Sequence, residues 1–150
     1  MKKPRVPSAL IGIAGVHYVV AELSRRGLIA LPTTRNTAGY DIIVTTPDGE
    51  KHANIQVKTS QDKVTGWLVP PSDRICSKPN DHYVCLRWIE KEKRFECFMI
   101  PGSEVKETVA ADEHSDYSQS RRREGKAQLV FICIGERKDE WKRRWEDWSL

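Results

Sequence analysis

Three polar side chains of this sequence have the types and spacing needed to act together on a phosphate ester. Asp41 follows Gly39 and Tyr40, and Gln56 and Lys58 lie further along the chain, separated by Val57. Hydrolysis of a phosphodiester with a divalent metal needs an anionic oxygen to hold the metal, and a cation to orient the water or offset developing charge. Asp41 is the candidate for the first role and Lys58 for the second.

Two extended segments must position these groups. Residues 40–46 are rich in β-branched side chains, Pro47-Asp48-Gly49 has turn chemistry, and residues 53–59 form a second extended run, which together predict a β-hairpin. Strand side chains alternate, so Gln56 and Lys58 point to one face while Ile55 and Val57 point to the other. The hairpin is therefore expected to bring Asp41 to the same place as Gln56 and Lys58.

The clearest predicted helix spans residues 8–26. Its apolar positions recur at steps of three and four, Ser8 is the expected N-cap, and Gly27 follows its end. A linker through Gly66 and two prolines is predicted next, followed by a second hairpin with strands at 83–89 and 95–100. The apolar residues of the helix are Ile13, Val16, Val20 and Leu23.

The last third of the chain predicts a short helix beginning near residue 101, a mobile polar stretch within 111–126, a strand at 128–134 and a helix at 138–150. Trp141, Trp145 and Trp148 fall on one stripe of that helix, which favours a face packed on the core over a base-stacking surface. The order of elements predicts one α/β domain over residues 1–150, with a mixed central β-sheet flanked by helices.

Composition excludes several classes of protein. The 150 residues are 39% hydrophobic and 31% charged, with a formal net charge of +4. No apolar run approaches the length of a membrane span, and no secretory signal is evident, so the expected location is cytoplasmic without a membrane partner. The four cysteines lack the spacing of a zinc ribbon, and Cys85 and Cys97 are expected as buried, reduced thiols.

At the hairpin the sequence resembles the PD-(D/E)xK nuclease superfamily, which has the restriction-endonuclease-like fold. The match consists of Gly39-Tyr40-Asp41 with its apolar strand, the Pro-Asp-Gly turn, and Ile55 to Ser60, preceded by the helix that ends at Gly27. The resemblance covers roughly residues 10–60. It implies that Asp41 and the Val57 carbonyl hold Mg²⁺ or Mn²⁺, and that Lys58 assists the attacking water. It also implies a homodimer or tetramer acting on DNA.

The sequence departs from the family pattern at two positions. Gln56 occupies the place where most members have Glu or Asp, and Val16 occupies the place of a metal-binding Glu in many resolvase-like members. Glu22 lies elsewhere around the helix and cannot replace that carboxylate. His17 is expected as a packed or surface residue rather than a ligand. Asp41 is thus the single carboxylate expected at the site.

Other polar groups are candidates for holding substrate. Arg35 and Asn36 in the loop before Asp41, together with Ser60, are the expected substrate contacts. Two basic clusters suit phosphate contacts or solvated surface equally well. These clusters are Arg121 to Arg123 with Lys126, and Lys91 with Lys93 and Arg94.

The sequence thus favours a restriction-endonuclease-like domain that hydrolyses DNA with a divalent metal, with Asp41, Gln56 and Lys58 as catalytic residues. The alternative is a catalytically inactive nucleic-acid-binding or assembly subunit of the same fold. A structural protein with no role on nucleic acid is the third interpretation, and salt-dependent retention on DNA separates it from the other two.

Overall fold

A computed structural model describes residues 6–34, 39–61, 66–113, 130–133 and 135–150 of the chain. Its centre is a five-stranded sheet with strand order β1-β2-β3-β5-β6. Strands β3 and β5 run parallel and the other neighbours are antiparallel, so the predicted mixed α/β sheet is confirmed. The strands are β1 (Ile29–Pro32), β2 (Ile42–Thr45), β3 (His52–Ser60), β5 (Asp81–Ile89) and β6 (Arg94–Pro101).

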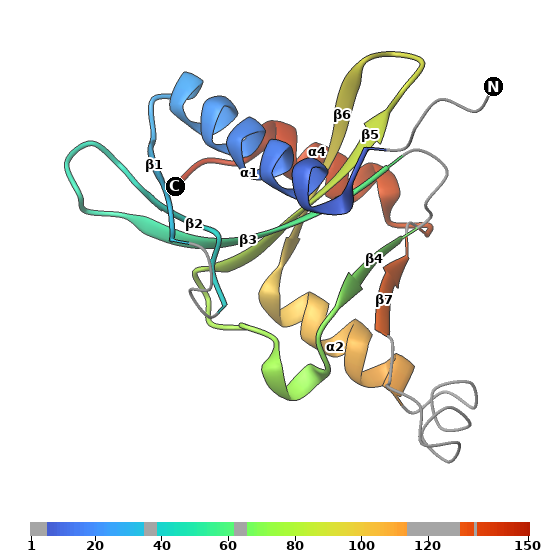
Figure 1. Ribbon diagram of the computed structural model, residues 1–150. Coiled ribbons are helices and arrows are strands. Elements are labelled where there is room, and N and C mark those ends of the chain that lie inside the picture. The colour runs from blue at the N-terminus through green and yellow to red at the C-terminus, as the bar shows by residue number, and fades with distance from the viewer. Residues whose placement is uncertain (1–5, 35–38, 62–65, 114–129, 134) are drawn as a thin grey trace.

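Helix α1 (Ser8–Arg25) covers one face of this sheet (Figure 1). Val19 and Leu23 of the helix are fully buried against Ile55 and Val57 of β3. The helix ends as expected, because Gly27 adopts the left-handed conformation with φ 84°. Its start differs from the prediction: the N-cap is Pro7, without a side-chain hydrogen bond, and Ser8 is the first helical residue.

The opposite face of the sheet is covered by α2 (Gly102–Glu113) and by a separate ribbon of β4 (Gly66–Val69) and β7 (Val130–Cys133), while α4 (Lys138–Asp147) packs along the edge strand β6. The predicted linker through Gly66 is therefore wrong in part, since residues 66–69 form a strand. Strand β7 pairs with β4 rather than with the central sheet. This pairing joins segments far apart in the chain, which local patterns cannot reveal.

The two predicted hairpins and the tryptophan stripe are confirmed. Strands β2 and β3 pair with Ile42 opposite Ile55, and β5 pairs with β6. Trp141 is buried in the core on the ribbon side, and Trp145 is buried in the core beneath α1. Helix α4 thus joins the two cores, and its tryptophans pack on the core as expected.

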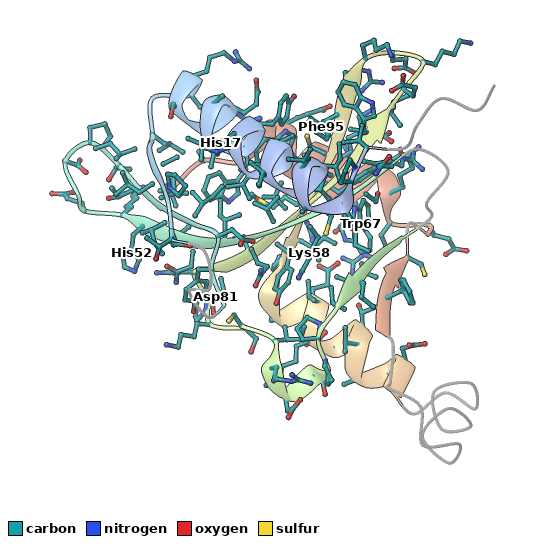
Figure 2. All side chains as sticks on the ribbon, viewed as in Figure 1. His17, His52, Lys58, Trp67, Asp81 and Phe95 are labelled. Carbon is teal, nitrogen blue, oxygen red and sulfur yellow. The ribbon has the colours of Figure 1, made fainter. Side chains whose placement is uncertain are left out.

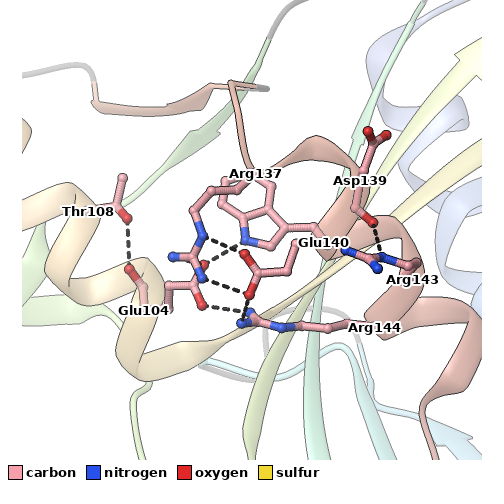
Figure 3. A network of polar contacts seen from close by, with 8 residues as sticks. Glu104, Thr108, Arg137, Asp139, Glu140, Arg143 and Arg144 are labelled. Carbon is pink, nitrogen blue, oxygen red and sulfur yellow. Dashed lines mark hydrogen bonds and ion pairs between the residues drawn. The ribbon is translucent and has the colours of Figure 1, made fainter.

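A polar network fastens α4 to α2 (Figure 3). Glu104 of α2 accepts hydrogen bonds at 2.6 Å from Trp141 Nε1 and Arg144 Nη1, and forms an ion pair at 2.6 Å with Arg137. Arg144 also pairs with Glu140 one turn away. The charge of Glu104 is therefore matched by two guanidinium groups from α4 and the residue before it.

No helix in the described part of the chain is both long and apolar enough to span a membrane. Cys85 and Cys97 are buried free thiols, as predicted. Burial raises the pKa of each thiol to about 12, so both are protonated at neutral pH. The predicted mobile stretch within 111–126 falls largely outside the described residues.

Candidate functional site

The Asp41 carboxylate lies immediately before β2 and reaches across to β3. Its Oδ2 accepts a hydrogen bond of 3.0 Å from Gln56 Nε2 and one of 2.7 Å from the backbone N–H of Val57. The Asp41 backbone N–H donates to Ile55 O at 2.9 Å, which continues the β2–β3 ladder by one residue. The structure therefore brings Asp41 and Gln56 together, as the hairpin predicts.

The neighbouring strands hold Asp41 in this place. On the β1 side, Thr33 Oγ1 donates to Tyr40 O at 2.7 Å and Thr33 N donates to Asp41 O at 2.9 Å. On the β5 side, burial and the neighbouring Asp81 carboxylate raise the pKa of Tyr40 to about 12. Tyr40 is therefore protonated at neutral pH, and its backbone carbonyl is bound to Thr33.

Asp81 is itself a buried carboxylate, with 2% of its surface exposed. It accepts hydrogen bonds from Asn54 Nδ2 at 2.9 Å and from Lys78 N at 2.8 Å, in addition to the contact with Tyr40. These donors satisfy its oxygens, so Asp81 acts as a structural brace behind Asp41. The sequence analysis did not identify the structural role of Asp81. The one nearby feature in the sequence was Tyr40, which precedes Asp41.

The Val57 carbonyl points to the β2 side of β3, which is the side on which Asp41 lies. In a strand, the N–H and C=O of one residue point toward the same neighbouring strand. Since Val57 N–H bonds Asp41, the Val57 carbonyl is also directed to the β2 side, beyond the point where β2 begins at Ile42. The predicted carbonyl donor is thus close to the predicted carboxylate donor.

Lys58 lies one pleat beyond Gln56 on the same face of β3, and its register partner is Cys85. Burial raises the pKa of the Cys85 thiol to about 12, and the Lys58 charge acts in the opposite direction. Within the described residues Lys58 forms no ion pair. Its charge is therefore not neutralised by a described carboxylate.

A cavity of about 260 Å³ opens beside Lys58, and we name it the Lys58 cavity. Ser60 is part of its wall and donates a hydrogen bond of 3.3 Å to Leu86 O. Figure 2 shows Lys58 and Trp67, another wall residue, on the far side of the sheet from His17. The residues of the wall are Ser8, Ile11, Lys58, Thr59, Ser60, Gln61, Gly66, Trp67, Leu68 and Phe131.

The α1 residues considered as further ligands do not reach Asp41. Val16 packs against the core beneath α1, His17 is exposed, and Glu22 pairs with Arg25 at 2.9 Å. In the described residues no three His, Cys, Asp or Glu side chains are grouped so that they could hold a metal. The oxygen donors that remain are the Asp41 carboxylate, the Gln56 amide and the Val57 carbonyl.

The predicted phosphate contacts have different outcomes. Arg35 and Asn36 lie outside the described residues, as do Arg121 to Arg123 and Lys126. In the turn between β5 and β6, Lys93 pairs with Glu90 and Arg94 with Glu92, each at 2.5 Å. These ion pairs compensate the charges of Lys93 and Arg94, so we interpret this turn as solvated surface rather than as a phosphate-binding site.

Comparison with known proteins gives one informative result. No family model matches the sequence, and no curated protein matches it. The bacterial homing endonuclease I-Ssp6803I has a similar structure, with a TM-score of 0.51 and 12% sequence identity, over 95% of this chain and 91% of that one. The likeness shows that this chain shares the mixed α/β fold of that protein.

Proposed function

We propose that the protein is a DNA endonuclease of the PD-(D/E)xK type that uses Mg²⁺ or Mn²⁺ to hydrolyse phosphodiester bonds. The observation that carries the proposal is the Asp41 carboxylate, which is bound to β3 by the uncharged N–H donors of Gln56 and Val57, with Lys58 further along the same strand and free of any described ion pair. The fold shared with a homing endonuclease supports it.

The residues present fit a hard divalent cation. All candidate donors are oxygens: one Asp41 carboxylate, the Gln56 amide oxygen and the Val57 carbonyl. Mg²⁺ and Mn²⁺ prefer oxygen ligands, and Mg²⁺ is commonly held by one or two carboxylates together with substrate phosphates. A single carboxylate is therefore sufficient when the DNA supplies the remaining anionic oxygens.

The roles of the side chains follow from their positions. When bound, the cation would polarise the scissile phosphate and acidify a water molecule. Asp41 and the Val57 carbonyl hold the cation, and Gln56 orients the Asp41 carboxylate through its amide N–H. Lys58 positions the attacking water and offsets the negative charge that develops on the phosphate. Arg35, Asn36 and Ser60 bind the substrate.

The oligomeric state is part of this proposal. One such site cuts one strand at a time, and two paired sites, as the resemblance implies, would cut both strands of a duplex together. We therefore expect a homodimer or tetramer when the protein is bound to DNA.

A second candidate function is supported by a different observation. Val16 is apolar where many resolvase-like relatives carry a carboxylate, and it packs against the core. A member of the fold with so few acidic groups at its site can serve as a nucleic-acid-binding or assembly subunit without cleaving DNA.

Calorimetric titration with Mn²⁺ and a cleavage assay separate the two candidates. The wild type is expected to bind Mn²⁺ and to cut linear, branched or single-stranded DNA, and Asp41→Ala is expected to lose both properties. Asp147→Ala changes an exposed carboxylate at the end of α4 and should retain both. Intact DNA in every assay, with salt-dependent DNA binding but no Mn²⁺ binding, would favour the inactive subunit.

A further inference from the structure

We propose that the Lys58 cavity receives one unpaired nucleobase of the DNA next to the phosphate that is cut. This inference rests on the proposed function, because it assumes that Lys58 faces that phosphate. The cavity begins at Lys58 and continues along Ser60 and Gln61, away from Asp41. A nucleotide whose phosphate meets Lys58 therefore has its base within reach of this hollow.

The wall of the cavity combines two kinds of surface. Apolar surface comes from Ile11, Trp67, Leu68 and Phe131. Ser60 Oγ and Gln61 Nε2 already donate to Leu86 O and Val6 O, so these two residues offer acceptor oxygens, and Ser8 adds a third polar side chain. Trp67 is held in place because its Nε1 donates to Leu86 O at 2.7 Å. A nucleobase has apolar faces and a hydrogen-bonding edge, and proteins recognise unpaired bases through both.

The ribbon of β4 and β7 supplies a stacking surface at the rim of the cavity. Leu68 and Phe131 are directly opposite each other in the ribbon, and they are 52% and 44% exposed. Directly opposed side chains on one face of a ribbon form a continuous apolar patch. Exposed aromatic side chains beside a positive charge are the usual platform for bases of single-stranded nucleic acid.

The geometry favours an unpaired base over a paired one. In a duplex the bases are stacked inside and the phosphates lie outside, so a hollow beyond the phosphate contact is reached only by a base that leaves the stack. Leaving the stack costs least for a bulged, mismatched or single-stranded base. The cavity therefore predicts a preference for DNA with an unpaired nucleotide at the cleavage position.

The size of the cavity limits what can occupy it. At about 260 Å³ it falls below the range of typical pockets for drug-sized ligands, and it is much too small for a helix of a partner protein. Lys58, without a described ion pair, favours an anionic partner over an apolar segment of a second copy. A single nucleotide satisfies both the size and the charge.

Fluorescence anisotropy in EDTA tests this proposal without cleavage. Two labelled duplexes of the same sequence are compared, one fully paired and one with a single bulged nucleotide. We expect the wild type to bind the bulged DNA about 10-fold more tightly, and Phe131→Ala to remove most of that preference, because base stacking on an aromatic ring is worth about that factor. Leu68→Ala serves as the second variant if circular dichroism shows that Phe131→Ala is unfolded.

Leu31→Ala is the matched control, since Leu31 is 55% exposed on β1 and does not line the cavity. Equal affinity for the two DNAs, unchanged by Phe131→Ala, would overturn the base pocket while leaving the proposed DNA binding intact. Absence of binding to both DNAs would overturn the proposed function as well. A change of sedimentation coefficient in Phe131→Ala, with DNA affinity unaltered, would assign the patch to contact between copies and overturn the pocket.

Discussion

Glu104 and Asp41 are two carboxylates in the same small domain, and their surroundings differ in one respect. Glu104 receives Arg137, Arg144 and the indole N–H of Trp141, so its charge is compensated by cations. Asp41 receives the Gln56 amide and the Val57 backbone N–H, which are both uncharged. Each carboxylate has hydrogen-bond donors, but only Glu104 has described ion-pair partners.

This difference in partners distinguishes Asp41 from Glu104; Asp81 also has only uncharged donors, but it is 2% exposed and so is closed to a metal ion from solvent. Cationic partners remove the field that would attract a metal ion, whereas neutral N–H donors orient the carboxylate and leave most of its charge in place. Glu96 belongs with Glu104, since it pairs with Arg87 at 2.5 Å and lies within 4 Å of Lys138 and Lys142. Among these three carboxylates, Asp41 is the one suited to recruit a cation.

The largest effect is expected for Asp41→Asn. The amide retains an oxygen that accepts the hydrogen bonds of Gln56 and Val57, but it lacks the charge needed to hold a divalent ion. We expect cleavage to fall about 1,000-fold or more, with little change in the free energy of unfolding. Initial cleavage rates in Mg²⁺ and a urea unfolding curve measure the two quantities. If Asp41→Asn unfolds more readily than the wild type but cleaves at the wild-type rate, Asp41 has a structural role like that of Glu104.

Lys58→Met is expected to have the next largest effect on cleavage. Methionine preserves most of the apolar stem and removes the charge that would act on the phosphate. The cleavage rate should fall about 100-fold, and stability should change little because Lys58 has no described ion-pair partner. Single-turnover kinetics at saturating DNA measure the rate. Lys93→Met, in the turn between β5 and β6, is the control that should cleave at the wild-type rate.

Glu104→Gln is expected to show the opposite pattern from Asp41→Asn. Loss of the charge leaves Arg137 and Arg144 without their shared partner, so the free energy of unfolding should fall by about 2 kcal/mol. DNA cleavage should remain at the wild-type rate, because the network lies between α2 and α4. Urea unfolding and the cleavage assay check both statements. A loss of cleavage in folded protein would contradict the division between the two carboxylates.

The smallest expected effect is a loss of stability at acidic pH that depends on Glu96. Burial raises the pKa of Glu96, but the hydrogen bond and charge of Arg87, with Lys138 and Lys142, outweigh burial and lower it below the ordinary value of 4.5. The stability contributed by this group is therefore complete above pH 4.5 and is lost as the pH falls through the lower folded-state pKa. We expect a contribution of about 1 kcal/mol.

Unfolding of the wild type and of Glu96→Gln between pH 6 and pH 3 measures that contribution. The wild type should lose more stability than the variant on acidification, since the variant has no carboxylate at this position to titrate. Parallel pH profiles for the two proteins would show that Arg87 and Glu96 contribute no net stability through their charges.

Local sequence patterns predicted the elements that carry the candidate site. The β-branched runs around the Pro-Asp-Gly turn predicted the β2–β3 hairpin, and alternation predicted that Gln56 and Lys58 share a face. The contact between Asp41 and Gln56 followed from these two features, since strands joined by a short turn have one natural register. The tryptophans of α4 were predicted to pack on the core for a similar reason, because helical periodicity is local.

Other features depended on contacts between distant segments. The β4–β7 ribbon joins segments whose pairing has no short turn to signal it, so residues 66–69 were predicted as linker and the wall of the Lys58 cavity was missed. The bond between Asn54 and Asp81 beside the site also links two strands, β3 and β5. The N-cap prediction at Ser8 was wrong by one residue, because the chain before α1 enters through Pro7.

The sequence by itself determined which side chains can meet on one hairpin, because strand periodicity and turn chemistry operate over a few residues. Only the tertiary structure decided which carboxylates are neutralised and which keep their charge, since Arg137 and Arg144 reach Glu104 from a distant helix while no described cation pairs with Asp41. Electrostatic compensation depends on distance in space rather than on position along the chain.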